Sequence, residues 1–188
     1  MDAGQHAEKK GSTFLRNIIS LGVMILIVIA FSSLLRVFVL QGYTIPSGSM
    51  EETLMTGDAI FAEQVSYYFR DIEPGDIVTF QDPEIPGRIL VKRCIAVAGQ
   101  NVDLRDGRVY IDGIAQSESY TLGKPSEPLL RTSVTISYPY KVPVGKIWVM
   151  GDNRTNSQDS RYFGPIDASS VFGRAYMVYW PLEHLRVF

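Results

Sequence analysis

The sequence has 188 residues, 46% of them hydrophobic, a formal net charge of −2 and an isoelectric point near 5.7. This length fits one ordinary domain plus an appendage, and the scattered Lys and Arg residues form no basic run, so we expect no nucleic-acid partner. The single cysteine, Cys94, excludes an intramolecular disulfide and a cysteine-ligated zinc site, and we expect neither a metal nor a cofactor.

An uncharged, mostly apolar segment runs from Asn17 to Leu35 and is bounded by Arg16 and Arg36. About 20 helical residues at about 1.5 Å each cross a hydrocarbon core of about 30 Å, so this segment predicts a transmembrane helix in membrane lipid. A cleavable signal peptide is the alternative, but its apolar region is usually shorter and ends at small residues. The sequence Leu34–Phe38 at this point favours a retained anchor.

Positive charges are unevenly distributed about this segment. Lys9, Lys10 and Arg16 precede it, whereas Arg36 alone follows closely. The positive-inside bias therefore favours a single-pass protein of the cell membrane with its N-terminus in the cytoplasm. We expect three parts: a cytoplasmic tail (1–16), a transmembrane helix (17–35) and an extracytoplasmic domain (41–188).

Past the span, short β-type runs alternate with glycine and proline, which predicts an all-β domain. Asp106-Gly107 and Asp112-Gly113 flank one of these runs, and Asp-Gly is a strong hairpin signal. The segment Ser117–Pro139 is rich in Ser, Thr and Pro and predicts a long loop, within a loop or small insertion around 100–145. The runs are Ala59–Ala62, Asp76–Phe80, Arg88–Val91, Val109–Ile111 and Lys146–Met150.

Histidine is the usual partner of a catalytic serine, and this chain has only two. His6 precedes the span and His184 lies near the C-terminus, where a surface position is the simpler interpretation. The sequence also has no His-Glu-x-x-His motif and no glycine-rich phosphate loop ending in Gly-Lys-Ser/Thr. A hydrolase with this sequence therefore needs a different base.

Lysine can act as that base when apolar burial lowers its pKa from about 10.4 towards 7–8. Lys92 lies in the apolar run Ile89–Val97, and in an alternating strand it shares one face with Leu90 and Cys94. A strand-edge lysine whose ammonium stays in water is the alternative, and taken alone this run does not exclude it.

The segment Ile45–Met50 offers a nucleophile. It contains Ser47-Gly48-Ser49 directly after Pro46. A catalytic serine needs a tight, glycine-assisted bend that exposes its hydroxyl and directs N–H groups at one point. Ordinary loops have the same composition, so the segment is a weak signal by itself.

Together with the span, four further blocks resemble bacterial type I signal peptidase, the leader peptidases with a Ser/Lys dyad. The last block is the most specific, and the resemblance extends from about Ser20 to Gly173. In chain order the four blocks are Pro46-Ser47-Gly48-Ser49-Met50 continuing to Thr53-Leu54, then Gly75-Asp76-Ile77-Val78, then Lys92-Arg93, and then Gly151-Asp152-Asn153-Arg154 through Asn156-Ser157 to Asp159–Gly164.

The resemblance implies a mainly β fold of short, partly barrel-like antiparallel sheets behind the anchor helix. It implies a serine endopeptidase that works through an acyl-enzyme, with Ser49 as the nucleophile and Lys92 as the general base. The oxyanion would be bound by the backbone N–H of Ser49 and the hydroxyl of Ser47.

The same resemblance assigns supporting roles. Ser157 would hydrogen-bond the amine of Lys92 and orient it, and Asp159 with Arg161 would form a structural ion pair beside the site. The partners would be exported preproteins, whose signal peptides would bind as an added strand and be cut at small-x-small sites. The pocket next to the scissile bond would be lined by Ile45, Leu54, Leu90 and Val91.

Four residues depart from the family pattern. Glu52 stands where proline is usual, Thr155 replaces an aspartate, and Ala98 and Gln100 replace parts of a Pro-Gly-Asp turn. None of them is a proton-transfer group, so we expect effects on turn rigidity, substrate preference or rate alone.

Three alternatives remain open at this point. The chain could be another Ser-Lys protease, such as a self-cleaving repressor, although it has an anchor and no helix-turn-helix. It could process one dedicated exported substrate by the same chemistry. It could also be an inactive domain that binds exported peptides, although Ser47, Ser49, Lys92 and Ser157 are all in place.

Overall fold

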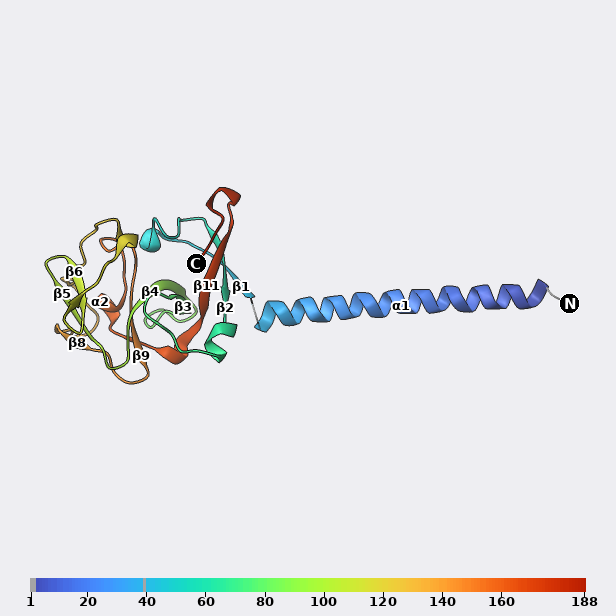
Figure 1. Cartoon of the computed structure of the whole chain (residues 1–188), viewed down its shortest axis with the longest axis horizontal. Coiled ribbons are helices and arrows are strands. Elements are labelled where there is room, and N and C mark those ends of the chain that lie inside the picture. The colour runs from blue at the N-terminus through green and yellow to red at the C-terminus, as the bar shows by residue number, and fades with distance from the viewer. Residues whose placement is uncertain (1–2, 39) are drawn as a thin grey trace. The chain divides into compact units, whose positions relative to one another are not determined.

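The computed structural model describes residues 3–38 and 40–188, with side chains described for 16–33 and 41–188. The chain divides into two compact units, Met1–Val39 and Leu40–Phe188, which are described separately below. Figure 1 shows the first as one helix and the second as a domain built mainly of strands. The mainly β fold class with an N-terminal apolar helix is therefore confirmed.

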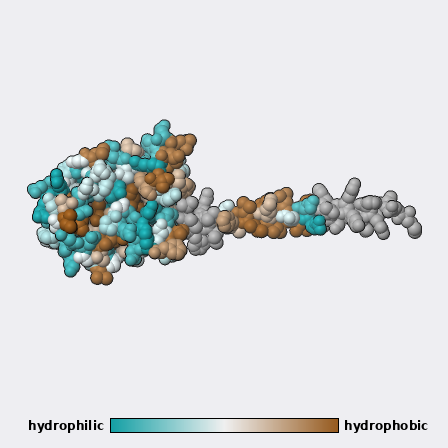
Figure 2. All heavy atoms as spheres, in the orientation of Figure 1, coloured by the Kyte–Doolittle hydropathy of each residue, from teal (hydrophilic) through white to brown (hydrophobic). Residues whose placement is uncertain are grey.

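The first unit contains a single helix, α1 (Ala3–Phe38). Its window Arg16–Ser33 has a mean hydropathy of 1.9 and its side chains are exposed, so it is long and apolar enough to cross a membrane. Figure 2 shows mostly hydrophobic residues along this part of the helix. The helix continues into the tail expected over 1–16, and residues 1, 2 and 39 lie outside the described residues.

The larger sheet of the second unit is antiparallel and has the strand order β1-β2-β11-β3-β4-β9-β10, with β12 paired to β11. This order runs from β1 at one end to β10 at the other, and the pairings of the described strands do not close it into a barrel. Its strands are β1 (Leu40–Thr44), β2 (Ala59–Glu63), β3 (Ile77–Gln81), β4 (Ile89–Val97), β9 (Lys146–Met150), β10 (Ile166–Asp167), β11 (Val171–Trp180) and β12 (Arg186–Val187).

The smaller sheet has the order β7-β6-β5-β8. The hairpins expected at Asp106-Gly107 and Asp112-Gly113 are confirmed, because β6 pairs with β5 on one side and with β7 on the other. All four turn residues have positive φ, as type I′ turns require. The strands are β5 (Asn101–Arg105), β6 (Arg108–Ile111), β7 (Ile114–Ala115) and β8 (Tyr140–Lys141).

The remaining elements of this unit are short helical turns. Between β7 and β8 the chain has only one such turn, so most of Ser117–Pro139 forms no regular structure. The turns are η1 (Gly48–Met50), η2 (Val65–Tyr68), η3 (Ser119–Thr121), α2 (Ser160–Phe163), η4 (Ala168–Ser170) and η5 (Leu182–His184).

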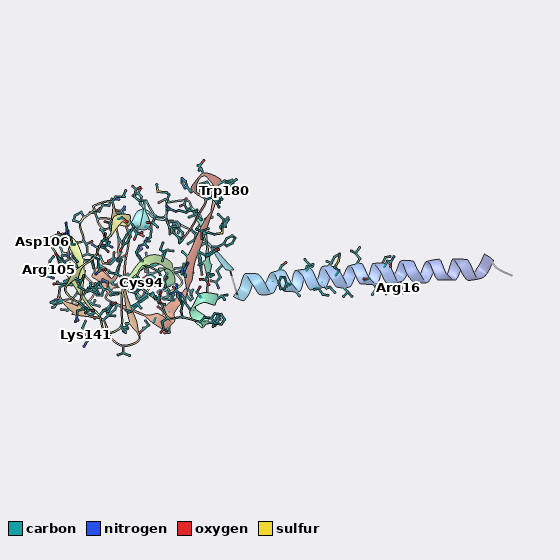
Figure 3. All side chains as sticks on the ribbon, viewed as in Figure 1. Arg16, Cys94, Arg105, Asp106, Lys141 and Trp180 are labelled. Carbon is teal, nitrogen blue, oxygen red and sulfur yellow. The ribbon has the colours of Figure 1, made fainter. Side chains whose placement is uncertain are left out.

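Three hydrophobic clusters form the core of the domain. One joins the two sheets through Trp148 of β9 and Val102 of β5. A second contains Val78 and Cys94, and Figure 3 shows Cys94 in the interior of the domain. The third packs Met50 of η1 against residues of β2 and β11 and so fixes the segment around Ser49 to the large sheet.

Candidate active site

Ser49 lies in the short helix η1. This helix begins directly after Ser47, an extended residue with φ −142° and ψ 155°. The next residue, Met50, is 1% exposed, and its carbonyl accepts a hydrogen bond of 2.7 Å from the backbone N–H of Leu54. The buried Met50 anchors this turn while Ser49 stays partly exposed. The nucleophile expected from the sequence is therefore held on a fixed turn with an accessible hydroxyl.

Lys92 lies in β4, between β3 and β9, and is 3% exposed. Its Nζ lies 2.7 Å from Oγ of Ser49 and donates to the carbonyl of Val91 at 3.1 Å. Burial disfavours the charged ammonium and lowers the pKa of Lys92 to about 8. A neutral amine is thus accessible near neutral pH within hydrogen-bond distance of a serine hydroxyl.

The two other serines expected at the site lie on either side of this pair. Oγ of Ser47 is exposed and lies 3.5 Å from Oγ of Ser49. Oγ of Ser157 is buried and has no hydrogen-bond partner among the described residues, so the expected bond to Lys92 is not formed in this structure. Ser157 instead packs against Gly151, where an added Cβ would overlap both Oγ of Ser157 and the carbonyl oxygen of Ser49.

Asp159 and Arg161 form a buried ion pair with an Nη2–Oδ2 distance of 2.9 Å. Asp159 also accepts from the backbone N–H of Gly151 at 3.0 Å and caps the short helix α2. Burial alone would raise the pKa of Asp159, but the Arg161 guanidinium and these hydrogen bonds hold it below its ordinary value. The pair therefore fixes the backbone of Gly151, against which Ser49 and Ser157 pack.

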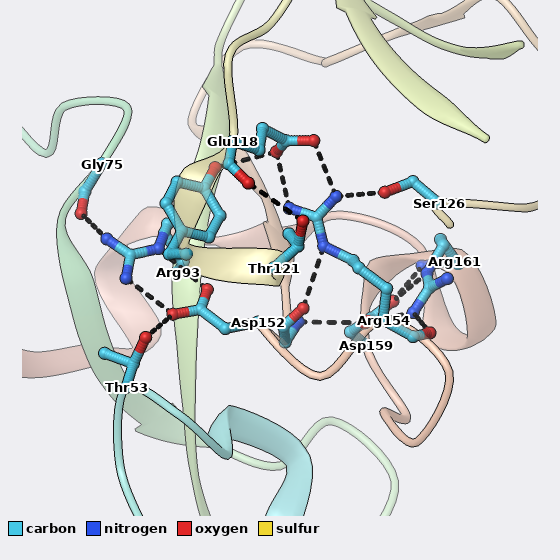
Figure 4. Close-up of polar contacts among 12 residues, drawn as sticks. Thr53, Gly75, Arg93, Glu118, Thr121, Ser126, Asp152, Arg154, Asp159 and Arg161 are labelled. Atoms are coloured by element: carbon cyan, nitrogen blue, oxygen red, sulfur yellow. Dashed lines mark hydrogen bonds and ion pairs between the residues drawn. The ribbon is translucent and has the colours of Figure 1, made fainter. Parts of the chain in front are cut away.

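Figure 4 shows two further ion pairs, to whose residues the sequence analysis assigned no individual roles. Arg93 binds Asp152 with Nη2–Oδ2 2.6 Å, and Arg154 binds Glu118 with Nη2–Oε1 2.6 Å. The ring of Tyr120 lies under the guanidinium of Arg93, with 4.0 Å from Cζ to the ring centroid. Asp152 and Arg154 belong to the most specific sequence block, which could have drawn attention to them. Their partners Arg93 and Glu118 are distant along the chain, so the sequence did not indicate the pairing.

A cavity of about 100 Å³ adjoins the pair of Ser49 and Lys92. Three of the four expected pocket residues, Ile45, Leu90 and Val91, line it. Leu54 does not line it, and its side chain is fully buried in the cluster that also contains Ile45 and Met50. A cavity of this volume accommodates only a small side chain. Its complete lining is Tyr43–Ser47, Ser49, Met50 and Ile89–Lys92.

The arrangement brings together a serine hydroxyl, a buried lysine amine and a small cavity. Among the residues that the structure describes, no group of three or more His, Cys, Asp and Glu side chains is placed to hold a metal ion. Cys94 is fully buried, and burial raises the pKa of its thiol to about 12, so it is not a competing nucleophile.

Residues 18–180 match the family model described as signal peptidase, peptidase S26. The chain is 36% identical over 165 residues to "Probable signal peptidase I-1" of Synechocystis sp., covering 84% of this chain and 80% of that protein. It is 34% identical over 183 residues to "Signal peptidase I T" of Bacillus subtilis, covering 96% and 92%.

Two further similarities cover a smaller share of one of the two proteins compared. The chain is 37% identical to "Thylakoidal processing peptidase 1, chloroplastic" of Arabidopsis thaliana, covering 81% of this chain but 46% of the longer plant protein. A solved structure of a signal peptidase I from Enterococcus faecalis V583 is 33% identical with a TM-score of 0.47, covering 56% of this chain and 97% of that one.

Proposed function

The chain belongs to the signal peptidase family, peptidase S26, and we propose that it removes signal peptides from exported preproteins at a membrane surface. It is a serine endopeptidase of that family. The observation that carries the mechanism is the 2.7 Å approach of the buried Lys92 amine to the Ser49 hydroxyl.

In the first half-reaction, neutral Lys92 takes the proton from Ser49 as Oγ attacks the scissile carbonyl carbon. The backbone N–H of Ser49 and the Ser47 hydroxyl stabilise the oxyanion, and one such donor contributes about 10²–10³ in rate. Lys92 then returns the proton to the departing amine as the C–N bond breaks. An ester between Ser49 and the signal peptide remains.

In the second half-reaction, neutral Lys92 takes a proton from water, which attacks the ester carbonyl carbon. Lys92 then returns this proton to Oγ of Ser49 as the C–O bond of the ester breaks and the signal peptide leaves. We assign the alignment of the Lys92 amine to the hydroxyl of Ser157, which is buried and has no hydrogen-bond partner among the described residues. The pair of Asp159 and Arg161 acts indirectly, by fixing Gly151.

The cavity of about 100 Å³ supports cleavage after small residues. A large side chain would not fit in this cavity unless its lining residues, which include Ile45, Leu90 and Ser49, moved apart. The flanking segments Tyr43–Ser47 and Ile89–Val91 are extended and accept a substrate as an additional strand. These features favour a small residue directly before the scissile bond, and the second small residue of a small-x-small site is proposed from the family resemblance alone.

The function is tested by cleavage of a preprotein with an Ala-x-Ala site by the detergent-solubilised chain. We expect Ser49→Ala and Lys92→Ala each to lower kcat by at least about 10³-fold, because nucleophile and base act as a unit. Matched controls are Ser117→Ala and Lys141→Ala, two exposed positions that should retain full activity. No cleavage by the wild-type chain would favour a dedicated substrate or a binding role, and activity in Lys92→Ala would exclude this mechanism.

We further propose that the N-terminus lies in the cytoplasm and the catalytic domain outside it, because Lys9, Lys10 and Arg16 precede the apolar segment. Protease added to intact spheroplasts should then degrade the domain beginning at Leu40. If the domain is degraded only after the membrane is opened, the orientation is the opposite of the one proposed.

A further inference from the structure

A carboxylate is fixed directly beside the nucleophile without being part of the proton-transfer machinery. Nδ2 of Asn153 donates to Oε2 of Glu51 at 3.0 Å and to the carbonyl of Gly48 at 2.9 Å. The backbone N–H of the same asparagine donates to the carbonyl of Ser49 at 3.1 Å. Since Asn153 is 4% exposed, these three bonds attach the Glu51 carboxylate rigidly to the nucleophile turn.

The negative charge of this carboxylate is not neutralised within the described part of the chain. The ion pairs there do not include Glu51, whose side chain is partly exposed. A Cβ placed on Gly48 would lie 3.4 Å from Oε2 of Glu51 and 3.8 Å from Nδ2 of Asn156. An acid and an amide therefore flank Gly48, the residue that precedes the nucleophile.

The position of this polar group relative to the cavity indicates which part of a substrate meets it. Under the proposed function, the cavity beside Ser49 holds the residue before the scissile bond. Neither Glu51 nor Asn153 nor Asn156 lines this cavity. A substrate that fills the cavity and presents its carbonyl to Ser49 must continue past the turn outside the cavity. Glu51 is the charged residue that directly follows the Ser49 turn, and Asn153 holds its carboxylate there.

We propose that Glu51, positioned by Asn153, binds the first residues after the cleavage site and selects for positive charge there. This inference rests on the proposed function and adds a charge preference for the leaving segment. It also gives the carboxylate a second use, because the α-amino group freed when the C–N bond breaks becomes a cation beside it on taking up a proton. Glu51 is thus a specificity-determining residue, and it does not transfer a proton.

The test uses the full-length chain in non-ionic detergent and three preproteins that differ only in the second residue after the cleavage site: Lys, Gln or Glu. At low salt we expect kcat/KM for the Lys substrate to exceed that for the Glu substrate about fivefold, with Gln between them. The ratio should shrink as NaCl rises towards about 1 M, because salt screens partly exposed charges.

Glu51→Gln removes the charge and retains an oxygen that accepts from Asn153, so its Lys to Glu ratio should fall within about twofold of unity. Glu52→Gln removes one charge from the neighbouring exposed residue and should keep the wild-type ratio. A wild-type ratio near one, or an equal response of the two variants, would overturn the inference while cleavage itself upheld the proposed function. Cleavage of none of the three substrates would overturn both this inference and the general processing of signal peptides.

Discussion

Lys92 shows how the interior of a sheet lowers the pKa of a lysine. Leu90 and Cys94, two residues away on either side, belong to one hydrophobic cluster with Val78, which is the cross-strand partner of Lys92. The apolar face expected from alternation along this strand is therefore confirmed. Because water is excluded from the amine, the ammonium loses solvation that its neighbours only partly replace, and this lowers its pKa.

Activity should therefore rise with pH. Lys92 is protonated and inactive as a base below its pKa of about 8 and neutral above it, so kcat/KM should increase through this pH and reach a plateau. Initial rates between about pH 6 and about pH 10 provide the measurement. A profile that is flat across this range would contradict a neutral Lys92 as the base.

The same shift predicts the pH dependence of stability. The folded chain gives up the Lys92 proton near pH 8, whereas the unfolded chain keeps it up to the ordinary pKa of 10.5. Between these values the unfolded state binds more protons, so this residue makes the free energy of unfolding increase with pH in that window. Below about pH 8 both states are protonated, and the contribution of Lys92 stays at its most unfavourable value.

Individual side-chain placements lay beyond sequence reasoning. Leu54 was expected to line the pocket, but it is fully buried in the hydrophobic cluster that also contains Ile45 and Met50. The side-chain rotamer of Ser157 could not be predicted either, because the spacing of residues along a chain does not determine χ angles. The pair of Ser49 and Lys92 was proposed because sequence blocks identify residue types, and their 2.7 Å separation needed coordinates.

At the scale of elements, strands with clear apolar runs were predicted well, as at β3, β4 and β9. The longest strand of the domain, β11 (Val171–Trp180), was missed. Its pairing with β2 has two register shifts, and its pairing with β3 has one. Each shift interrupts the alternation of buried and exposed residues on which strand prediction depends.

The departures from the family pattern fall in turns that use other means of fixing the chain. Glu52 has φ 79°, a conformation closed to proline, whose φ is held near −65°. Oε1 of Gln100 accepts from the backbone N–H of Val97 at 2.9 Å and closes the turn between β4 and β5, which Gly99 completes with φ 89°. These turns are therefore defined by hydrogen bonds and glycine in place of proline.

The irregular segment after β7 is attached to the large sheet through Glu118. Its partner Arg154 is buried, also bonds Ser126 and donates to the carbonyl of Gly151 at 3.0 Å. Glu118→Ala would leave the buried guanidinium without its carboxylate, and we expect the free energy of unfolding to fall by about 3 kcal/mol. Urea unfolding followed by tryptophan fluorescence provides the measurement.

The control for this prediction is an exposed ion pair of the same domain. Lys146 and Asp167 pair at 2.9 Å, with side-chain exposures of 35% and 64%. Asp167→Ala should change the free energy of unfolding by no more than about 1 kcal/mol. Equal effects of the Glu118 and Asp167 substitutions would show that the buried pair does not attach the segment.

At the scale of the whole molecule, the division into two units predicts that the domain folds without the helix. A chain of residues 40–188 retains all three hydrophobic clusters and should show a cooperative thermal transition by circular dichroism. A chain of residues 40–170 loses β11, with the fully buried Ala175 and Val178, and should show none. A cooperative transition in the shorter chain would contradict this account of the sheet.

The place of β11 between β2 and β3 has a consequence for how the protein is made. A ribosome releases β2 and β3 long before the strand that must lie between them. At about 5–20 residues per second, the roughly 90 residues from the end of β3 to the start of β11 take about 5–20 s to emerge. Throughout that interval the facing edges of β2 and β3 lack their partner, so the hydrophobic cluster that fixes the segment around Ser49 is completed only when translation is almost finished.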